Sequence, residues 1–81
     1  MEYLSGVVER ITYANEESGY TVIKLKSKGF YELVTVVGNM ASVHVGAIIS
    51  LKGEWKVDSR YGKQFVASNY EEKIPASVAG I

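Results

Sequence analysis

The sequence predicts an all-β domain whose five strands close into a barrel. Valine and isoleucine together outnumber leucine by 17 to 4, and β-branched side chains favour pleated sheets over helices. Polar and apolar residues alternate with a period of two in several segments, and clusters of glycine, serine and asparagine separate these segments. With 81 residues and an apolar fraction of 47%, the chain suffices for one domain with one core.

Two expected strands open the chain. Residues 4–14 are partly apolar on both faces, which is typical of a long strand that bends between two sheets. In residues 19–27 the alternation is clear, since Thr21, Ile23 and Leu25 share one face. The opposite face carries the residues Tyr20, Val22, Lys24 and Lys26. The polar residues 15–19 form the turn between these two strands.

Three further strands follow. Residues 31–38 are almost entirely apolar or β-branched, which predicts a strand covered on both sides. In residues 47–57 one face carries Ile49, Leu51, Trp55 and Val57. Gly53 lies inside this strand, where a bulge or a sharp bend is expected. In residues 61–73, Phe65 and Ala67 alternate with an opposite face that carries Val66, Ser68 and Tyr70.

The remaining connections are short. Residues 27–29 predict a tight hairpin in which Gly29 takes a positive φ. Residues 38–46 have room for one helical turn between strands three and four, with Asn39 as its N-cap. Residues 58–62 join the last two strands.

This order of strands predicts a closed five-stranded barrel of the OB type, with an SH3-like barrel as the alternative. We expect residues 1–73 to form the barrel, with Ile23, Leu25, Leu51, Trp55 and Phe65 buried. Residues 74–81 contain the only proline, Pro75, which suits the first turn of a helix. We expect them to be poorly packed and to begin the linker or helical region of a following domain.

The composition argues against catalytic chemistry in this chain. It has no cysteine and one histidine, His44, whereas zinc needs three or four close ligands. No phosphate-binding GxxxxGK[ST] motif occurs. The acidic pairs 16–17 and 71–72 lie in polar stretches and are expected to be solvated, and His44 is expected to be solvated or to cap a turn. We therefore expect no catalytic residue, metal or cofactor in these residues.

The same composition suggests a cytoplasmic, bacterial source. Absence of cysteine fits a reducing compartment. The first residues contain Glu2 and lack an apolar run of signal-peptide length, and no segment approaches the roughly 20 apolar residues that span a membrane.

An OB barrel offers one recurrent binding face, formed by strands two and three and by the first and last loops. Cations there attract the nucleic-acid backbone and aromatic rings stack on bases. The candidate contacts on this face are Tyr20, Lys24, Lys26, Arg60, Tyr61 and Lys63. Glu16 and Glu17 in the first loop would repel phosphate. In the structural alternative the lysines only solvate the strands, Tyr61 packs over the barrel end and Arg60 pairs with Asp58.

Two motifs carry a resemblance to a known family. Residues 16–22 read EESGYTV, and residues 60–65 read RYGKQF. Together with residues 4–26, 33–40 and 53–65, they resemble the N-terminal OB domain of the longer RecD-like ATP-dependent DNA helicases, the type that works without RecB and RecC. The resemblance runs from Leu4 to about Ile81. Family members often have asparagine at the position of Ser18 and proline at that of Ser59, so the last loop is less rigid here.

The resemblance implies that the full-length protein is an ATP-dependent 5′-to-3′ DNA helicase of the exodeoxyribonuclease V alpha type, with a role in DNA repair and recombination. In that family the barrel precedes a helix-hairpin-helix region and two RecA-like motor domains, and residues 75–81 resemble the entry to that region. ATP and magnesium would be bound by the motor domains. The family assigns no DNA-contacting residue in the barrel.

Two functions remain open from the sequence. The chain could hold single-stranded DNA near the motor domains of its parent, for which the basic and aromatic last loop argues. It could instead dock on those motor domains or recruit a partner protein, such as a single-strand-binding protein. The net charge of zero and the acidic first loop favour docking.

Overall fold

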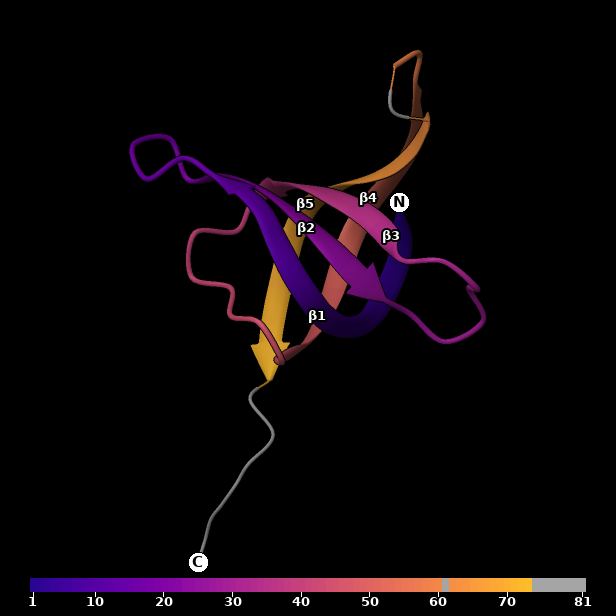
Figure 1. Ribbon diagram of the computed structural model, residues 1–81, viewed down its shortest axis with the longest axis horizontal. Helices are drawn as coiled ribbons and strands as arrows, with labels where there is room; N and C mark the ends of the chain where they lie inside the picture. Colours follow the sequence, from indigo (N-terminus) through magenta and orange to yellow (C-terminus); the bar gives the residue numbers. More distant parts are fainter. Residues whose placement is uncertain (61, 74–81) are drawn as a thin grey trace, which may run out of the picture.

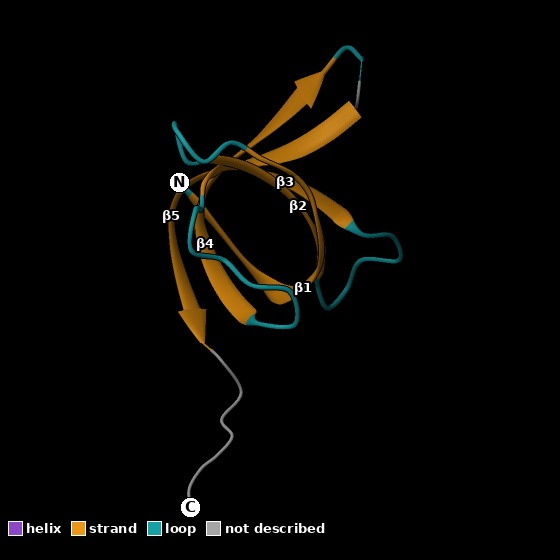
Figure 2. Ribbon diagram, turned by 60° about the vertical axis from the view of Figure 1, so that its left-hand side comes forward, coloured by secondary structure: helices purple, strands orange, loops and turns teal. Residues whose placement is uncertain are grey.

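The chain folds as a closed barrel of five strands. The computed structural model describes residues 1–60 and 62–73. The strands are β1 (Glu2–Ala14), β2 (Tyr20–Lys26), β3 (Val34–Asn39), β4 (Ile48–Asp58) and β5 (Gly62–Lys73). They close in the order β1-β2-β3-β5-β4, with β3 parallel to β5 and the other neighbours antiparallel (Figures 1 and 2). This Greek-key barrel confirms the predicted OB fold.

The long first strand bends as expected and pairs with two neighbours. Val7 lies opposite Lys26 of β2 and also opposite Ile48 of β4. Two shifts in the pairing with β2 leave Glu9 and Thr12 without a partner residue in β2. Such bulges bend a strand and increase its twist, which lets β1 close the barrel.

The core lies inside the barrel and is apolar. Every strand contributes inward-facing side chains, and residues 40–47 cover one end. Its buried members are Leu4, Val8, Ile23, Leu25, Val34, Val36, Met40, Val43, Ala47, Ile49, Leu51 and Phe65. The predicted burial of Ile23, Leu25, Leu51 and Phe65 is therefore confirmed.

The expected irregularity at Gly53 is present. Gly53 faces Ala67 while Lys52 faces Asn69, so Ser68 is an extra residue in β5. A Cβ atom at Gly53 would overlap the carbonyl oxygen of β5 residue 66 and lie 2.9 Å from the Cα of Ala67. Glycine is needed here because the two strands approach too closely for any side chain.

Three side chains on β4 and β5 differ from the prediction. Tyr70, expected on the outer face, packs against the core, because the extra residue Ser68 reverses the alternation beyond it. Trp55, expected to be buried, is only partly buried. Val57 shares the inward face of β4 yet is 81% exposed. The cause is that the β4–β5 hairpin extends beyond the barrel, where no strand covers it (Figure 1).

The predicted helical turn between β3 and β4 is absent from the described residues 40–47. Two separate turns form instead, in which the amide of Val43 donates to Met40 at 3.1 Å and that of Ala47 donates to His44 at 3.2 Å. The backbone amide of Gly46 donates a hydrogen bond of 2.8 Å to the carbonyl of Val8, so the end of this loop pairs with β1 instead of continuing a helix. The expected N-cap, Asn39, is instead the last residue of β3.

The connection between β2 and β3 is longer than the predicted tight hairpin. Gly29 has the expected positive φ, 91°, but β3 begins only at Val34, so residues 31–33 lie in the loop. The ring of Phe30 lies 5.8 Å from that of Trp55, centre to centre. This contact holds the loop close to the β4–β5 hairpin, and β3 therefore begins later in the sequence, at Val34.

The described part of the chain ends with β5. The expected linker at residues 74–81, including Pro75, lies outside the described residues. Residues 1–60 and 62–73 contain no helix that is long and apolar enough to cross a membrane.

Candidate nucleic-acid interface

A groove of about 470 Å³ runs over the outer face of the barrel at β2. The alternation of β2 turns Tyr20, Val22 and Lys24 toward it, as the sequence predicts. Neighbouring strands supply the rest of its wall, and the β4–β5 hairpin supplies a rim. These further lining residues are Thr12 and Tyr13 of β1, Thr35 and Val37 of β3, Asp58 of β4 and Gln64 of β5.

Two tyrosines occupy one part of this groove. The rings of Tyr13 and Tyr20 lie 6.2 Å apart, centre to centre, and are tilted by 59°. Both side chains are about half exposed, at 50% and 44%. Each ring is thus held by the other while part of it stays open to solvent, which is the arrangement that an unpaired base can stack on.

A lysine that lines the groove is held in place by a hydrogen bond. The Nζ atom of Lys24 donates a hydrogen bond of 2.6 Å to Oγ1 of Thr35 on β3. Arg10 of β1 lies directly opposite Lys24 in the sheet. Like charges in this position destabilise a sheet unless an anion compensates them. The pair therefore favours an anionic ligand, such as a phosphate, over this part of β1 and β2.

The first loop, residues 15–19, is shaped by Asn15. Its Oδ1 atom accepts hydrogen bonds from the amides of Glu17 at 2.9 Å and Ser18 at 3.1 Å. Glu16 and Glu17 are exposed on this loop, which projects from the barrel at the upper left of Figure 1. As expected from the sequence, their carboxylates oppose phosphate at this end of the groove.

The last loop closes the β4–β5 hairpin. The Oδ1 atom of Asp58 accepts a hydrogen bond of 2.7 Å from the backbone amide of Arg60. Gly62 takes a φ of 82°, which lets the chain turn back. Arg60 is exposed in the turn of this hairpin, which projects at the upper right of Figure 1. Asp58 thus shapes the turn through the backbone of Arg60.

A second hollow of about 400 Å³ adjoins the groove, and we call it the Trp55 hollow. It lies between residues 30–35 and the β4–β5 hairpin, and Lys24 and Thr35 line both it and the groove. Lys63 of β5 contributes its Nζ atom, 4.6 Å from the centre of the Trp55 ring. The two depressions therefore meet at Lys24.

A family comparison agrees with this geometry. The model of the OB-fold domain of the ATP-dependent DNA helicase YrrC matches residues 1–75. The chain belongs to this family of OB-fold domains. The match confirms the resemblance to the OB domain of RecD-like helicases that the sequence motifs indicated. No solved structure matches the chain.

In this helicase OB domain the predicted contact residues do not form a single cluster. Tyr20 and Lys24 line the groove, and Lys63 lines the adjoining Trp55 hollow. Lys26 lies further along the same face of β2, at the end of the strand, and is exposed. Arg60 lies at the hairpin tip, and Tyr61 lies outside the described residues. The site residues remain predictions, and the groove and hollow indicate where they would act.

Four residues of the interface were not identified as site residues from the sequence. Arg10 reaches the outer face because the register shift after Val8 reverses the alternation of β1, which simple alternation does not reveal. Tyr13 lies on the face that simple alternation gives it, because the second shift cancels the first, but it was not assigned to the site. Phe30 was assigned to no strand or site, although an aromatic residue beside Gly29 in a loop is a signal that could have been used. Trp55 was expected in the core.

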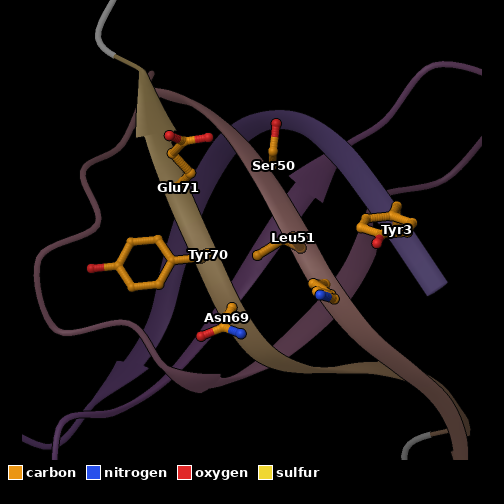
Figure 3. A pocket seen from close by; sticks show the side chains of 7 residues that line it. Tyr3, Ser50, Leu51, Asn69, Tyr70 and Glu71 are labelled. Carbon is orange, nitrogen blue, oxygen red and sulfur yellow. The ribbon is translucent and has the colours of Figure 1, made fainter. Parts of the chain in front are cut away.

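The outer face where β1, β4 and β5 run side by side is different in character (Figure 3). It holds a smaller hollow of about 210 Å³ lined by Tyr3, Lys52 and Glu71, among others. The Nζ atom of Lys52 lies 5.8 Å from the centre of the Tyr3 ring. Ile48 of the same strand is 43% exposed. Tyr3 and Lys52 on this face therefore serve as control positions for the tyrosines and lysines of the groove.

The histidine and the acidic pair at the end of β5 are linked to each other. One carboxylate oxygen of Glu72 lies 2.8 Å from the amide of His44 and 3.0 Å from its Nδ1 atom. The expectation that Glu72 is a solvated charge is therefore wrong, because its side chain is only 14% exposed and holds the loop 40–47. Among the described residues no group of three or more acidic, histidine or cysteine side chains is placed to hold a metal ion.

Proposed function

We propose that this chain is a non-catalytic accessory module of a RecD-like, 5′-to-3′ ATP-dependent DNA helicase, and that it binds single-stranded DNA and positions it near the motor domains. The family comparison supports a helicase OB domain. In this proposal ATP and magnesium act in the motor domains of the parent, and the barrel contributes only binding.

One observation carries the proposal. The groove combines two half-exposed tyrosine rings with a lysine that is held in place by Thr35. Stacking on aromatic rings and attraction of phosphates by cations are the two interactions with which OB folds bind single strands without sequence preference. A groove of this kind on the outer face of β2 and β3 is where such folds bind oligonucleotides.

The proposal is tested by fluorescence anisotropy of a labelled oligothymidylate at low salt, with wild type and Tyr20→Ala. Loss of one stacking ring is expected to weaken binding by about 1–3 kcal/mol, or roughly five- to 150-fold in Kd. The wild-type affinity itself is expected to be weak for the isolated domain, because the site is small and the net charge is zero.

Tyr3→Ala is the matched control, because Tyr3 is also an exposed tyrosine on the outside of the barrel but lies away from the groove. Its binding should equal that of the wild type. The proposal fails if the wild type leaves the anisotropy unchanged at low salt, or if both variants lose the same amount of affinity.

The second candidate is a docking module, for which the face in Figure 3 argues. Tyr3 is 74% exposed there, and the exposed Val7 and Ile48 pair with each other four residues further along the same face, so apolar surface is available for the motor domains of the same parent. A double variant, Tyr3→Ser with Ile48→Ser, would weaken association with the separately expressed motor domains in calorimetry. Unchanged DNA binding by the same variant would separate the two functions.

A further inference from the structure

The Trp55 hollow contains a pair of aromatic rings that are not among the fully buried residues of the core. Phe30 and Trp55 lie 5.8 Å apart, centre to centre, and are inclined by 31°. Phe30 is 43% exposed and Trp55 is partly buried. The two rings are thus tilted against each other, and Phe30 is partly open to solvent.

The Trp55 ring is fixed from behind. Its edge contact with Phe65 has a centre-to-centre distance of 5.1 Å and an angle of 79°. Phe65 is fully buried, so it anchors the indole at the mouth of the barrel. A ring that is already positioned loses little conformational entropy when a ligand stacks on it.

Two cations adjoin these rings. The Nζ atom of Lys63 lies 4.6 Å from the centre of the Trp55 ring, a cation–π contact, and Lys24 also lines the hollow. One carboxylate, Glu32, also lines the hollow. This combination of rings and charges suits a nucleotide whose flat, uncharged base stacks on the rings and whose phosphate lies close to the lysines and away from Glu32.

The hollow and the groove form one track. Lys24 and Thr35 line both, so no strand or loop separates them at that point. Tyr20 lies four residues from Lys24 on β2, or about 13 Å along the strand at the usual rise. An aromatic pair therefore lies on each side of one fixed lysine.

We propose that Phe30 and Trp55 form a second base-stacking site, which takes one unpaired nucleobase of the same single strand that the groove holds. The inference rests on the proposed function and adds to it a specific path, from Tyr13 and Tyr20 past Lys24 to Trp55. It also makes the loop between β2 and β3 part of the DNA-binding surface, beside the first and last loops.

The single tryptophan provides the test, because all tryptophan emission of this protein comes from this site. Titration with unlabelled oligothymidylate at low salt should quench the emission of Trp55, with the same midpoint as the anisotropy of a labelled strand. Phe30→Leu keeps an apolar side chain but removes the ring, and should raise Kd about five-fold or more, the loss expected for one stacked base.

Tyr31→Leu is the matched control. Tyr31 is the next residue of the same loop, is fully exposed and does not line the Trp55 hollow, so Kd should stay at the wild-type value. Both variants change exposed or half-exposed loop residues, so both are expected to fold, and thermal unfolding is the measurement that checks this. Lys63→Gln provides a second variant on β5, expected to weaken binding without changing the fold.

The possible results separate this inference from the proposed function. If anisotropy shows binding that depends on Tyr20, while Trp55 emission stays constant and Phe30→Leu binds like the wild type, the second stacking site is wrong and the groove stands. Equal losses in Phe30→Leu and Tyr31→Leu would also overturn it. If no strand binds at low salt by either measurement, the proposed function fails and this inference fails with it.

Discussion

Leu51 and Val57 share a face of β4 but lie in opposite environments. Leu51 is 2% exposed inside the barrel, whereas Val57 is 81% exposed on the part of the hairpin that extends beyond it. Alternation predicts which face a side chain is on, but it does not predict where along a strand the covering layer ends. The burial of Trp55 was overestimated for this reason.

The first prediction uses this difference. Leu51→Ala should lower the free energy of unfolding by roughly 2–5 kcal/mol, because it removes buried methyl groups and leaves a cavity in a closed barrel. Urea unfolding followed by tryptophan emission measures the effect. Val57→Ala, the control on the same face, should change stability by less than about 0.5 kcal/mol. A negligible loss in Leu51→Ala would mean that the inward face of β4 is misassigned, and a large loss in Val57→Ala would mean that the end of the hairpin is covered.

Part of the candidate site could be predicted residue by residue. Tyr20 and Lys24 follow from the period of two in β2, which is regular and lacks bulges. Arg10 could not be obtained in this way, because the shift after Val8 reverses the alternation that follows it. Tyr13 could have been, because the second shift restores the original alternation. The sequence does not mark these shifts with glycine or proline.

At the scale of elements, the five strands and their turns were predictable and the loop geometry was not. Glycine at position 53 signalled the irregularity in β4, but the extra residue is Ser68 on the partner strand, which turns Tyr70 toward the core, where it packs partly buried. Residues 38–46 were expected to contain a helical turn, yet their backbone groups pair with β1. That choice depends on a strand more than thirty residues away, and local propensity carries no information about it.

The second prediction concerns the close approach of β4 and β5. Gly53→Ala would place a Cβ against the backbone of β5, 2.9 Å from the Cα of Ala67. The two strands must separate, so we expect a loss of about 1–3 kcal/mol or more in urea unfolding. Ser50→Ala, an exposed position of the same strand, is the control and should be nearly neutral. A neutral Gly53→Ala would show that the bulge at Ser68 can absorb the side chain.

At the scale of the whole molecule, the charges cancel but are not evenly placed. The net charge is zero, so the domain as a whole does not attract DNA. Lys24 and Lys63 lie along the groove and the Trp55 hollow, and Arg60 lies at the tip of the adjacent hairpin. DNA binding should therefore depend on these few local contacts and on stacking. Glu16 and Glu17 should keep the bound DNA strand from extending over the first loop.

The last prediction is the salt dependence that follows from this distribution. If the three cations contact phosphates, the logarithm of the association constant for an oligothymidylate should fall against the logarithm of the salt concentration with a slope of about −2, since each contact on a single strand contributes about −0.7. Lys24→Gln should make the slope shallower by about 0.7. Lys52→Gln removes a lysine of similar burial on the opposite face and should leave the slope unchanged. A slope near zero in the wild type would mean that stacking alone holds the DNA. Equal changes of slope in Lys24→Gln and Lys52→Gln would mean that the groove has no special role in phosphate binding. Anisotropy titrations at four or more salt concentrations give these slopes without requiring tight binding.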